Sequence, residues 1–271
     1  MFVIPAQNPV AFDFFGIPIY WYGIIMALAI FVAMLTSNKL YNFVNVACRK
    51  DIIIEYAPVI IVSGIVGARL YFCTLHYDYY LTYPIEIFDL RQGGLSIHGA
   101  ILFGVLGMIV VAKRACVPIM SIMDAMACGT ILGQAMGRWG NYFNSEAYGL
   151  PVTSQSWGLY IPESRRILEY SNYSLFHPTF LYESVLNLVG FYLLLVIITK
   201  FGLKYRGITF FTYLCVYSII RFFIERIRLD SALNIAGGVP IAEVISLILL
   251  LVGVCGILYT IIKCSKFQQF K

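Results

Sequence analysis

Seven apolar segments, each about the length needed to cross a membrane as a helix, dominate the sequence of 271 residues. They cover residues 18–37, 52–74, 94–112, 119–137, 178–200, 207–225 and 239–262. Charged residues make up 12% of the chain, whereas a soluble domain contains about 25%. We therefore expect an all-α polytopic membrane protein with seven transmembrane helices, in which residues 1–271 form a single membrane domain.

Lysine and arginine are distributed unequally between the two ends of these segments. Eleven lie in the loops and the tail on one side, and six lie in the loops on the other. Because basic loops stay in the cytoplasm, this count predicts an external N-terminus and a cytoplasmic C-terminus. Residues 138–177 then lie outside. This connection is unusually long, so we expect it to form a small extracytoplasmic head between the fourth and fifth transmembrane helices.

The densest group of polar side chains lies in residues 137–149, at the end of the fourth apolar segment. Arg138 offers a fixed fork of donors that suits phosphate, and Asn141 can both donate and accept hydrogen bonds. Glu146 can hold the arginine or take a proton. Glycines such as Gly149 allow the backbone to approach a ligand closely. This composition predicts a site for an anionic headgroup at the membrane edge.

Several predicted spans contain ionisable residues, and those near the outer ends include Arg69, Arg221 and Glu225. Such residues are costly in lipid and often mark a functional site. Arg221 and Glu225 are four residues apart and can form an ion pair on one helix face. In a purely structural interpretation, Arg221 and Glu225 form an ion pair that binds no ligand, and the side chain of Arg69 extends to the membrane–water interface. Together with Arg138, however, three guanidinium groups near one membrane face predict an anion between them, and phosphate is the natural candidate.

His98 lies among glycines at the outer end of the third apolar segment. In one interpretation it is a hydrogen-bonded residue at a helix end. In the other it is a general base, a role that suits histidine because its unperturbed pKa is close to neutral pH. Tyr22 is either part of an aromatic belt or a hydrogen-bond donor to the ligand. His177 either lines the site together with Tyr182 and Glu183 or supports the first turn of the fifth span, and we favour the structural role.

Several other kinds of site have no signature in this sequence. There is no G-x-S-x-G, no H-E-x-x-H, no metal-ligand spacing and no CxxC pair, so we expect neither a metal nor a cofactor. No long basic run suggests a nucleic-acid partner. An anion transporter or channel would show an internal repeat and charges near the bilayer midplane, and neither is visible. An intramembrane protease would need a Ser–His or Asp–Asp pair at depth, and none is evident.

The order of these motifs resembles that of the prolipoprotein diacylglyceryl transferases of bacterial inner membranes, over essentially the whole chain. The motifs are Trp21-Tyr22-Gly23, Gly67-Ala68-Arg69 and residues 93–99, 137–149, 177–183 and 221–225. Two departures are mild, because Tyr142 stands where phenylalanine is expected and Ala100 replaces a second glycine. Neither removes a reactive group.

The resemblance implies transfer of the diacylglyceryl group from phosphatidylglycerol to the lipobox cysteine thiol of preprolipoproteins, with a thioether and glycerol-1-phosphate as products. The enzyme would act in the bacterial cytoplasmic (inner) membrane, with its active site toward the outer leaflet. Its partners would be phosphatidylglycerol and the preprolipoprotein signal peptides that carry a lipobox cysteine.

The resemblance also suggests roles for individual residues. Arg138 and Arg221 would clamp the phosphate, and His98 would take the thiol proton. In the alternative, an arginine lowers the thiol pKa and His98 only positions a group. The remaining phosphatidylglycerol-binding residues would be Tyr22, Asn141, Glu146, Gly149, Arg69 and Glu225, the last of which would hold Arg221.

Overall fold

The computed structural model describes residues 2–45, 49–89, 93–153, 157–229 and 240–269. Contacts within the chain divide it into two compact units, Met1–Ser37 with Asp124–Lys271, and Asn38–Met123.

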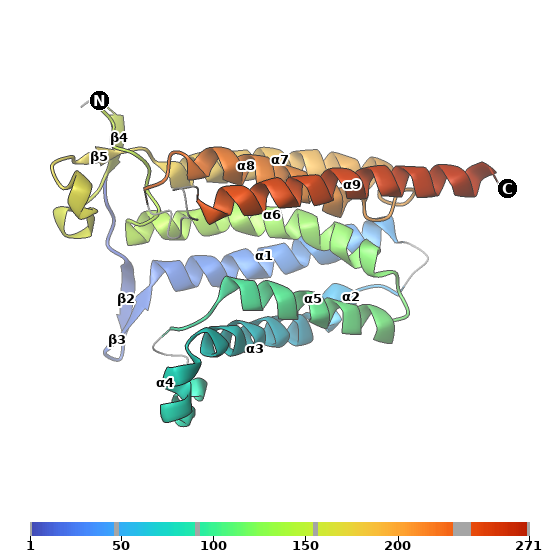
Figure 1. The fold of residues 1–271 in the computed structure, drawn as a ribbon, viewed down its shortest axis with the longest axis horizontal. Coiled ribbons are helices and arrows are strands. Elements are labelled where there is room, and N and C mark those ends of the chain that lie inside the picture. The colour runs from blue at the N-terminus through green and yellow to red at the C-terminus, as the bar shows by residue number, and fades with distance from the viewer. Residues whose placement is uncertain (1, 46–48, 90–92, 154–156, 230–239, 270–271) are drawn as a thin grey trace. The chain divides into compact units, whose positions relative to one another are not determined.

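Seven helices in the described residues are long and apolar enough to cross a membrane, as the hydropathy pattern predicts (Figure 1). They are α1 (Trp21–Val44), α3 (Ala57–Leu75), α5 (Ile97–Arg114), α6 (Ile119–Asn144), α7 (Thr179–Phe201), α8 (Ile208–Glu225) and α9 (Ile241–Gln269). This confirms a mostly helical, polytopic architecture.

Helix α6 is longer than predicted, because it continues for seven residues beyond Gly137 and ends at Asn144. The extension is held by aromatic packing. The ring of Tyr142 stacks on that of Phe180 at 4.9 Å between centroids, and Trp139 meets the same ring edge-on at 5.5 Å. Arg138 and Asn141 therefore project from a helix, not from a loop.

Short strands accompany the helices, and an all-α expectation misses them. In the first unit β1 (Phe2–Ile4) pairs in parallel with β4 (Trp157–Tyr160), which pairs antiparallel with β5 (Leu175–Phe176). Two further strands, β2 (Val10–Phe14) and β3 (Ile17–Tyr20), form a hairpin. Its turn contains Phe15 and Gly16, both with positive φ.

The residues between α6 and α7 form a compact structure with a core of its own. Besides β4 and β5 it contains the 3-10 turns η2 (Glu163–Arg165) and η3 (Leu168–Tyr170). Its core contains the buried side chains of Tyr148, Leu159, Ile161 and Phe176, together with Phe180 from the first turn of α7. The phenol of Tyr148 donates to the Arg165 carbonyl at 3.0 Å and accepts from the Ile167 amide at 2.9 Å. These contacts and the shared core hold the described part of this segment together, so it is more than an open loop.

In the first unit α1 packs against α6 along a stripe of small residues. A Cβ added to Gly133 would lie 3.4 Å from the Ala29 carbonyl oxygen, and one added to Gly137 would lie 3.3 Å from the Met26 sulfur. Small residues at such spacing let helix backbones approach closely in a membrane. The polar end of α6 consequently lies beside the first turns of α1.

The second unit contains α2 (Ile52–Glu55), α3, α4 (Tyr77–Thr82), the 3-10 turn η1 (Pro84–Phe88) and α5. Helices α3 and α5 pack closely through glycines, since a Cβ on Gly99 would lie 2.5 Å from that of Tyr71. The Ser96 amide donates to the Ala68 carbonyl at 3.0 Å, which fixes the start of α5 against α3.

Candidate active site

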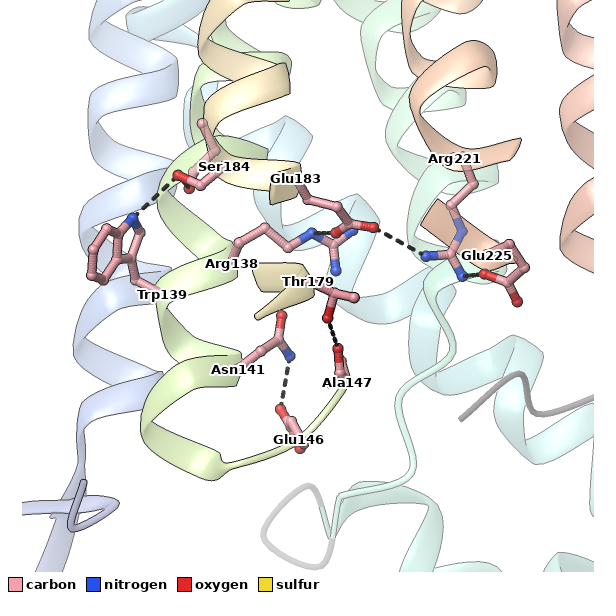
Figure 2. A network of polar contacts seen from close by, with 11 residues as sticks. Arg138, Trp139, Asn141, Glu146, Ala147, Thr179, Glu183, Ser184, Arg221 and Glu225 are labelled. Carbon is pink, nitrogen blue, oxygen red and sulfur yellow. Dashed lines mark hydrogen bonds and ion pairs between the residues drawn. The ribbon is translucent and has the colours of Figure 1, made fainter. Parts of the chain in front are cut away.

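Two arginines in the first unit are joined by one carboxylate. Arg138 on α6 pairs through Nε with Oε2 of Glu183 on α7. Nη1 of Arg221 on α8 lies 3.5 Å from Oε1 of the same glutamate. Figure 2 shows the Glu183 carboxylate between the two guanidinium groups. Three helices are therefore connected by a single side chain.

The shared carboxylate of Glu183 is buried, whereas the two arginines are partly exposed. Glu183 is 3% exposed, whereas the side chains of Arg138 and Arg221 are 24% and 19% exposed. In the described residues the ion pair of Arg138 with Glu183 is made through Nε and not through the two terminal nitrogens. These N–H groups are available to an anionic ligand.

The predicted ion pair of Arg221 with Glu225 is present, with 2.7 Å between Nη2 and Oε2. Glu225 is buried. Two guanidinium groups are thus balanced by two carboxylates, and the group is neutral overall. The anion that the sequence requires between Arg138 and Arg221 is supplied, within the protein, by Glu183.

The turn that follows α6 is organised by Glu146. Its Oε1 accepts hydrogen bonds from Nδ2 of Asn141 at 3.0 Å and from Nδ2 of Asn144 at 3.3 Å. Glu146 is exposed, and within the part of the chain that the structure describes its partners are these amides rather than an arginine. Farther along the turn, the Thr179 hydroxyl donates to the Ala147 carbonyl (Figure 2). The contact fixes the turn to the start of α7.

Two other predicted ligand residues pack closely against this region. The ring of Tyr22 lies against Gly140, where an added Cβ would be 2.7 Å from the ring atom Cδ2. Gly149 is enclosed, since its Cβ would lie 2.8 Å from that of His177, and its amide donates to the His177 carbonyl at 2.9 Å. Their packing explains why glycine occupies positions 140 and 149; lipid contacts for Tyr22 and Gly149 stay predictions.

In the second unit Arg69 is buried, and all its N–H groups face backbone carbonyl oxygens. Nε donates to Ile87 at 2.8 Å, Nη1 to Gly93 and Gly94 at 3.0 and 3.1 Å, and Nη2 to Glu86 and Asp89 at 2.5 and 2.9 Å. These contacts tie the chain before α5 to α3. A phosphate contact by Arg69 stays a prediction, and it would require some of these bonds to be exchanged.

His98 lies in the first turn of α5 and is exposed. Its ring is 6.1 Å from that of Tyr71, centroid to centroid. The glycines before it have positive φ, +83° at Gly93 and +73° at Gly94, so they shape the backbone that leads to the histidine. Exposure leaves the imidazole accessible for proton transfer, and that role stays a prediction.

An apolar cavity of about 260 Å³ lies between α1, α6 and α7 in the first unit. Its lining residues are Ile25, Leu28, Ala135, Met136, Trp139, Ser184 and Leu188. The indole Nε1 of Trp139 donates to the Ser184 hydroxyl at 3.2 Å, which in turn donates to the Ala135 carbonyl at 2.8 Å. Since its polar groups are satisfied, the cavity suits a hydrocarbon chain. Trp139 and Ser184 directly follow Arg138 and Glu183.

Two buried acids have partners that the sequence motifs do not predict. They are Glu183 on α7, which contacts both arginines, and Asp124 on α6, which accepts hydrogen bonds from the backbone amides of Gly207 and Phe210. A carboxylate within an apolar segment is a signal for a cationic or N–H partner. In the described residues no group of three or more His, Cys, Asp or Glu side chains could hold a metal ion.

A family model described as prolipoprotein diacylglyceryl transferase matches residues 9–259 of the chain. A protein of Parasynechococcus marenigrum named phosphatidylglycerol–prolipoprotein diacylglyceryl transferase is 37% identical over 268 residues, which cover 95% of this chain and 94% of the relative. Relatives with the same name from Halalkalibacterium halodurans and Clostridium botulinum are 39% and 36% identical, over 87% and 96% of this chain and 80% and 99% of their own. The matched residues include all the candidate site residues described above.

Proposed function

Because the chain belongs to the prolipoprotein diacylglyceryl transferase family, and is therefore a transferase, we propose that it acts on phosphatidylglycerol and preprolipoproteins. It transfers the diacylglyceryl group to the thiol of the lipobox cysteine. The products are a thioether-linked lipoprotein precursor and glycerol-1-phosphate.

The reaction is a substitution at the glycerol carbon that carries the phosphate ester. The thiol sulfur forms a bond to this carbon, the carbon–oxygen bond breaks, and its electron pair goes to the phosphate oxygen. The thiol proton passes to a base and ends on the leaving group or in water. A phosphodiester with one negative charge becomes a monoester with nearly two, so negative charge accumulates on the phosphate.

The observation that best supports the proposal is the pair of arginines held by Glu183. Arg138 keeps its two terminal nitrogens for a ligand, and Arg221 is fixed beside it by Glu183 and Glu225. Donors fixed in advance around an oxyanion stabilise charge as it develops, at no further cost of reorganisation. We assign Arg138 and Arg221 to the phosphate and Glu225 to the support of Arg221.

Other groups complete the proposed mechanism. His98 takes the proton of the substrate thiol, which is mostly protonated at neutral pH. Tyr22, Asn141 and Glu146 orient the glycerol headgroup. Gly149 and Arg69 shape the lipid site through the backbone that they hold in place. The apolar cavity beside Trp139 receives part of an acyl chain.

The proposed arrangement in the membrane follows the distribution of basic residues. The N-terminus and the head formed by residues 138–177 lie outside, the C-terminus lies in the cytoplasm, and the site opens toward the outer leaflet of the bacterial inner membrane. The chain acts as one membrane domain. Labelling of single introduced cysteines in intact cells with a membrane-impermeant maleimide should modify the head and spare the C-terminal residues.

The test of the function is mass spectrometry of a lipobox peptide incubated with the purified protein and phosphatidylglycerol vesicles. A diacylglyceryl mass increase on the cysteine, with release of glycerol-1-phosphate, is expected for the wild type. It should be absent for a peptide with serine at that position and for Arg138→Ala. Peptide cleavage, or an unchanged peptide with the wild-type protein, would contradict the proposal.

A further inference from the structure

Glu183 lies between the two proposed phosphate-binding arginines without being an obvious ligand itself. We propose that Glu183 is a positioning residue, which aligns Arg138 and Arg221 for the leaving phosphate and lowers the resting affinity for anionic lipid. The inference rests on the proposed function. Its basis is that one carboxylate, on a residue that is only 3% exposed, contacts arginines from two other helices.

The way in which Glu183 holds Arg138 determines what that arginine can present. The contact is made through Nε, the nitrogen nearest the backbone. Because a guanidinium is planar and rigid, fixing Nε sets the plane and direction of both terminal nitrogens. A carboxylate bound to those terminal nitrogens would have occupied the fork that suits a phosphate.

A count of donors supports the same assignment. Each guanidinium carries five N–H groups. Among the described residues, Arg138 is paired through one nitrogen, and Arg221 through two, with Glu183 and Glu225. The remaining donors are sufficient for the three terminal oxygens of a monoester leaving group. Glu183 thus aligns the arginines without using up their capacity to bind.

The charge of Glu183 has the opposite effect on binding. With both carboxylates ionised the group is neutral, and Glu183 repels the single charge of the lipid phosphate. Replacing it by glutamine removes that repulsion, but one oxygen becomes an amide NH₂ that cannot accept from an arginine. Affinity for the lipid should therefore rise or stay constant while turnover falls. Donors aligned with a developing oxyanion are worth about 10²–10³ in turnover.

A purely structural role would give a different pattern. Loss of a link between α6, α7 and α8 would lower the folded fraction and the melting temperature, and kcat per folded molecule would not change. A matched control is Glu243→Gln, which makes the same chemical change in another ion pair. In that pair Glu243 lies 3.4 Å from Nε of Arg226, whose side chain is 58% exposed.

The experiment compares the full-length wild type with Glu183→Gln, Glu183→Asp and Glu243→Gln. Transfer to a lipobox peptide gives kcat and the KM for phosphatidylglycerol. Quenching of tryptophan fluorescence by brominated phosphatidylglycerol, against brominated phosphatidylcholine, gives lipid binding independently of turnover. Trp139 lies next to Arg138 and is a suitable reporter.

For Glu183→Gln we expect kcat to fall about 100-fold or more, with KM and lipid binding unchanged or tighter. Glu183→Asp, which keeps both acceptor oxygens on a shorter stem, should recover part of kcat. Glu243→Gln should behave as the wild type. The inference is overturned if Glu183→Gln keeps kcat within threefold, or if it binds the lipid more weakly.

Failure of the proposed function would be recognised separately, by a wild-type protein that forms no diacylglyceryl peptide. In that case the binding of phosphatidylglycerol still tests the proposed position of Glu183. Tighter binding of phosphatidylglycerol by Glu183→Gln would still support its position beside the phosphate, and weaker binding would refute it.

Discussion

The carboxylate of Asp124 on α6 accepts a hydrogen bond from the backbone amide of Gly207 at 2.6 Å, although 83 residues separate them in sequence. Its other oxygen accepts from the amide of Phe210 at 2.8 Å. Gly207 precedes the first residue of α8, so Asp124 caps this helix from another helix. Buried backbone amides without partners are costly, and the cap satisfies two of them.

Replacing Asp124 by asparagine should destabilise the protein by about 1–3 kcal/mol, because the amide NH₂ cannot accept from the second backbone N–H. Thermal unfolding in detergent would measure the loss. The alanine variant should lose more, since both amides are then left without a partner. Activity per folded molecule should stay within about twofold of the wild type for asparagine. A variant that melts normally but has lost transfer activity would show that Asp124 acts in the reaction.

The second prediction concerns the close contact of Tyr22 with Gly140. Gly140→Ala places a methyl group 2.7 Å from the Tyr22 ring, so the ring or the helix must move. Overpacking of this kind costs about 1–3 kcal/mol. If Tyr22 orients the headgroup, the variant should also lose transfer activity beyond the loss of folded protein, and KM for phosphatidylglycerol should rise.

Gly104→Ala is the matched control for this prediction, because a Cβ at Gly104 meets no atom within 4 Å. It should leave both activity and melting temperature nearly unchanged, since alanine is favoured over glycine in a helix. Equal effects of the two substitutions would argue against a specific role for the Tyr22 contact.

Much of this architecture could be predicted from hydropathy. The seven apolar helices form because a backbone in lipid must satisfy its own hydrogen bonds, and about 20 apolar residues then suffice to identify each span. The end of α6 was not predictable in this way. It depends on the packing of Tyr142 and Trp139 against Phe180, which is far away in sequence. The pairing of β1 with β4 also joins distant segments, and short strands leave little local pattern.

The candidate site was predictable in its residue types but not in its connections. The sequence indicated Arg138, Arg221 and the partner Glu225, since an i,i+4 pair is a local feature. It did not indicate Glu183 as their common partner, because this glutamate is 45 residues from one arginine and 38 from the other. For the same reason the sequence predicts an external anion between the arginines, whereas the structure places Glu183 between Arg138 and Arg221. Arg69 was grouped with them because its carbonyl partners could not be foreseen.

The third prediction tests what Arg69 does. Its five N–H groups are directed at five carbonyl oxygens between residues 86 and 94, and lysine has only three donors at a single point. Arg69→Lys should destabilise the protein by roughly 2 kcal/mol or more. Hydrogen exchange should become faster in the segment before α5. If Arg69 instead binds phosphate, exchange should be unchanged and only KM for phosphatidylglycerol should rise. Arg49→Lys, in an exposed ion pair with Glu55, is the control and should have little effect.

The last prediction concerns pH and the loop before α2. Asp51 accepts hydrogen bonds from the side-chain amides of Asn38 and Asn42, both at 2.7 Å, and these lower the pKa of Asp51 below its ordinary 3.8. A carboxyl whose pKa is lowered by folding stabilises the folded state above its ordinary pKa, and this stabilisation disappears as the pH falls through the folded-state pKa.

Asp51→Asn isolates this effect, because asparagine tolerates the left-handed backbone, with φ of 58°, that position 51 requires. At pH 7 the variant should melt at a lower temperature than the wild type. The difference should shrink as the pH is lowered below about 3.8, where the carboxyl of the unfolded chain takes up a proton before that of the folded protein. A melting difference for Asp51→Asn that stayed constant down to pH 3 would mean that shape, not charge, explains the role of Asp51.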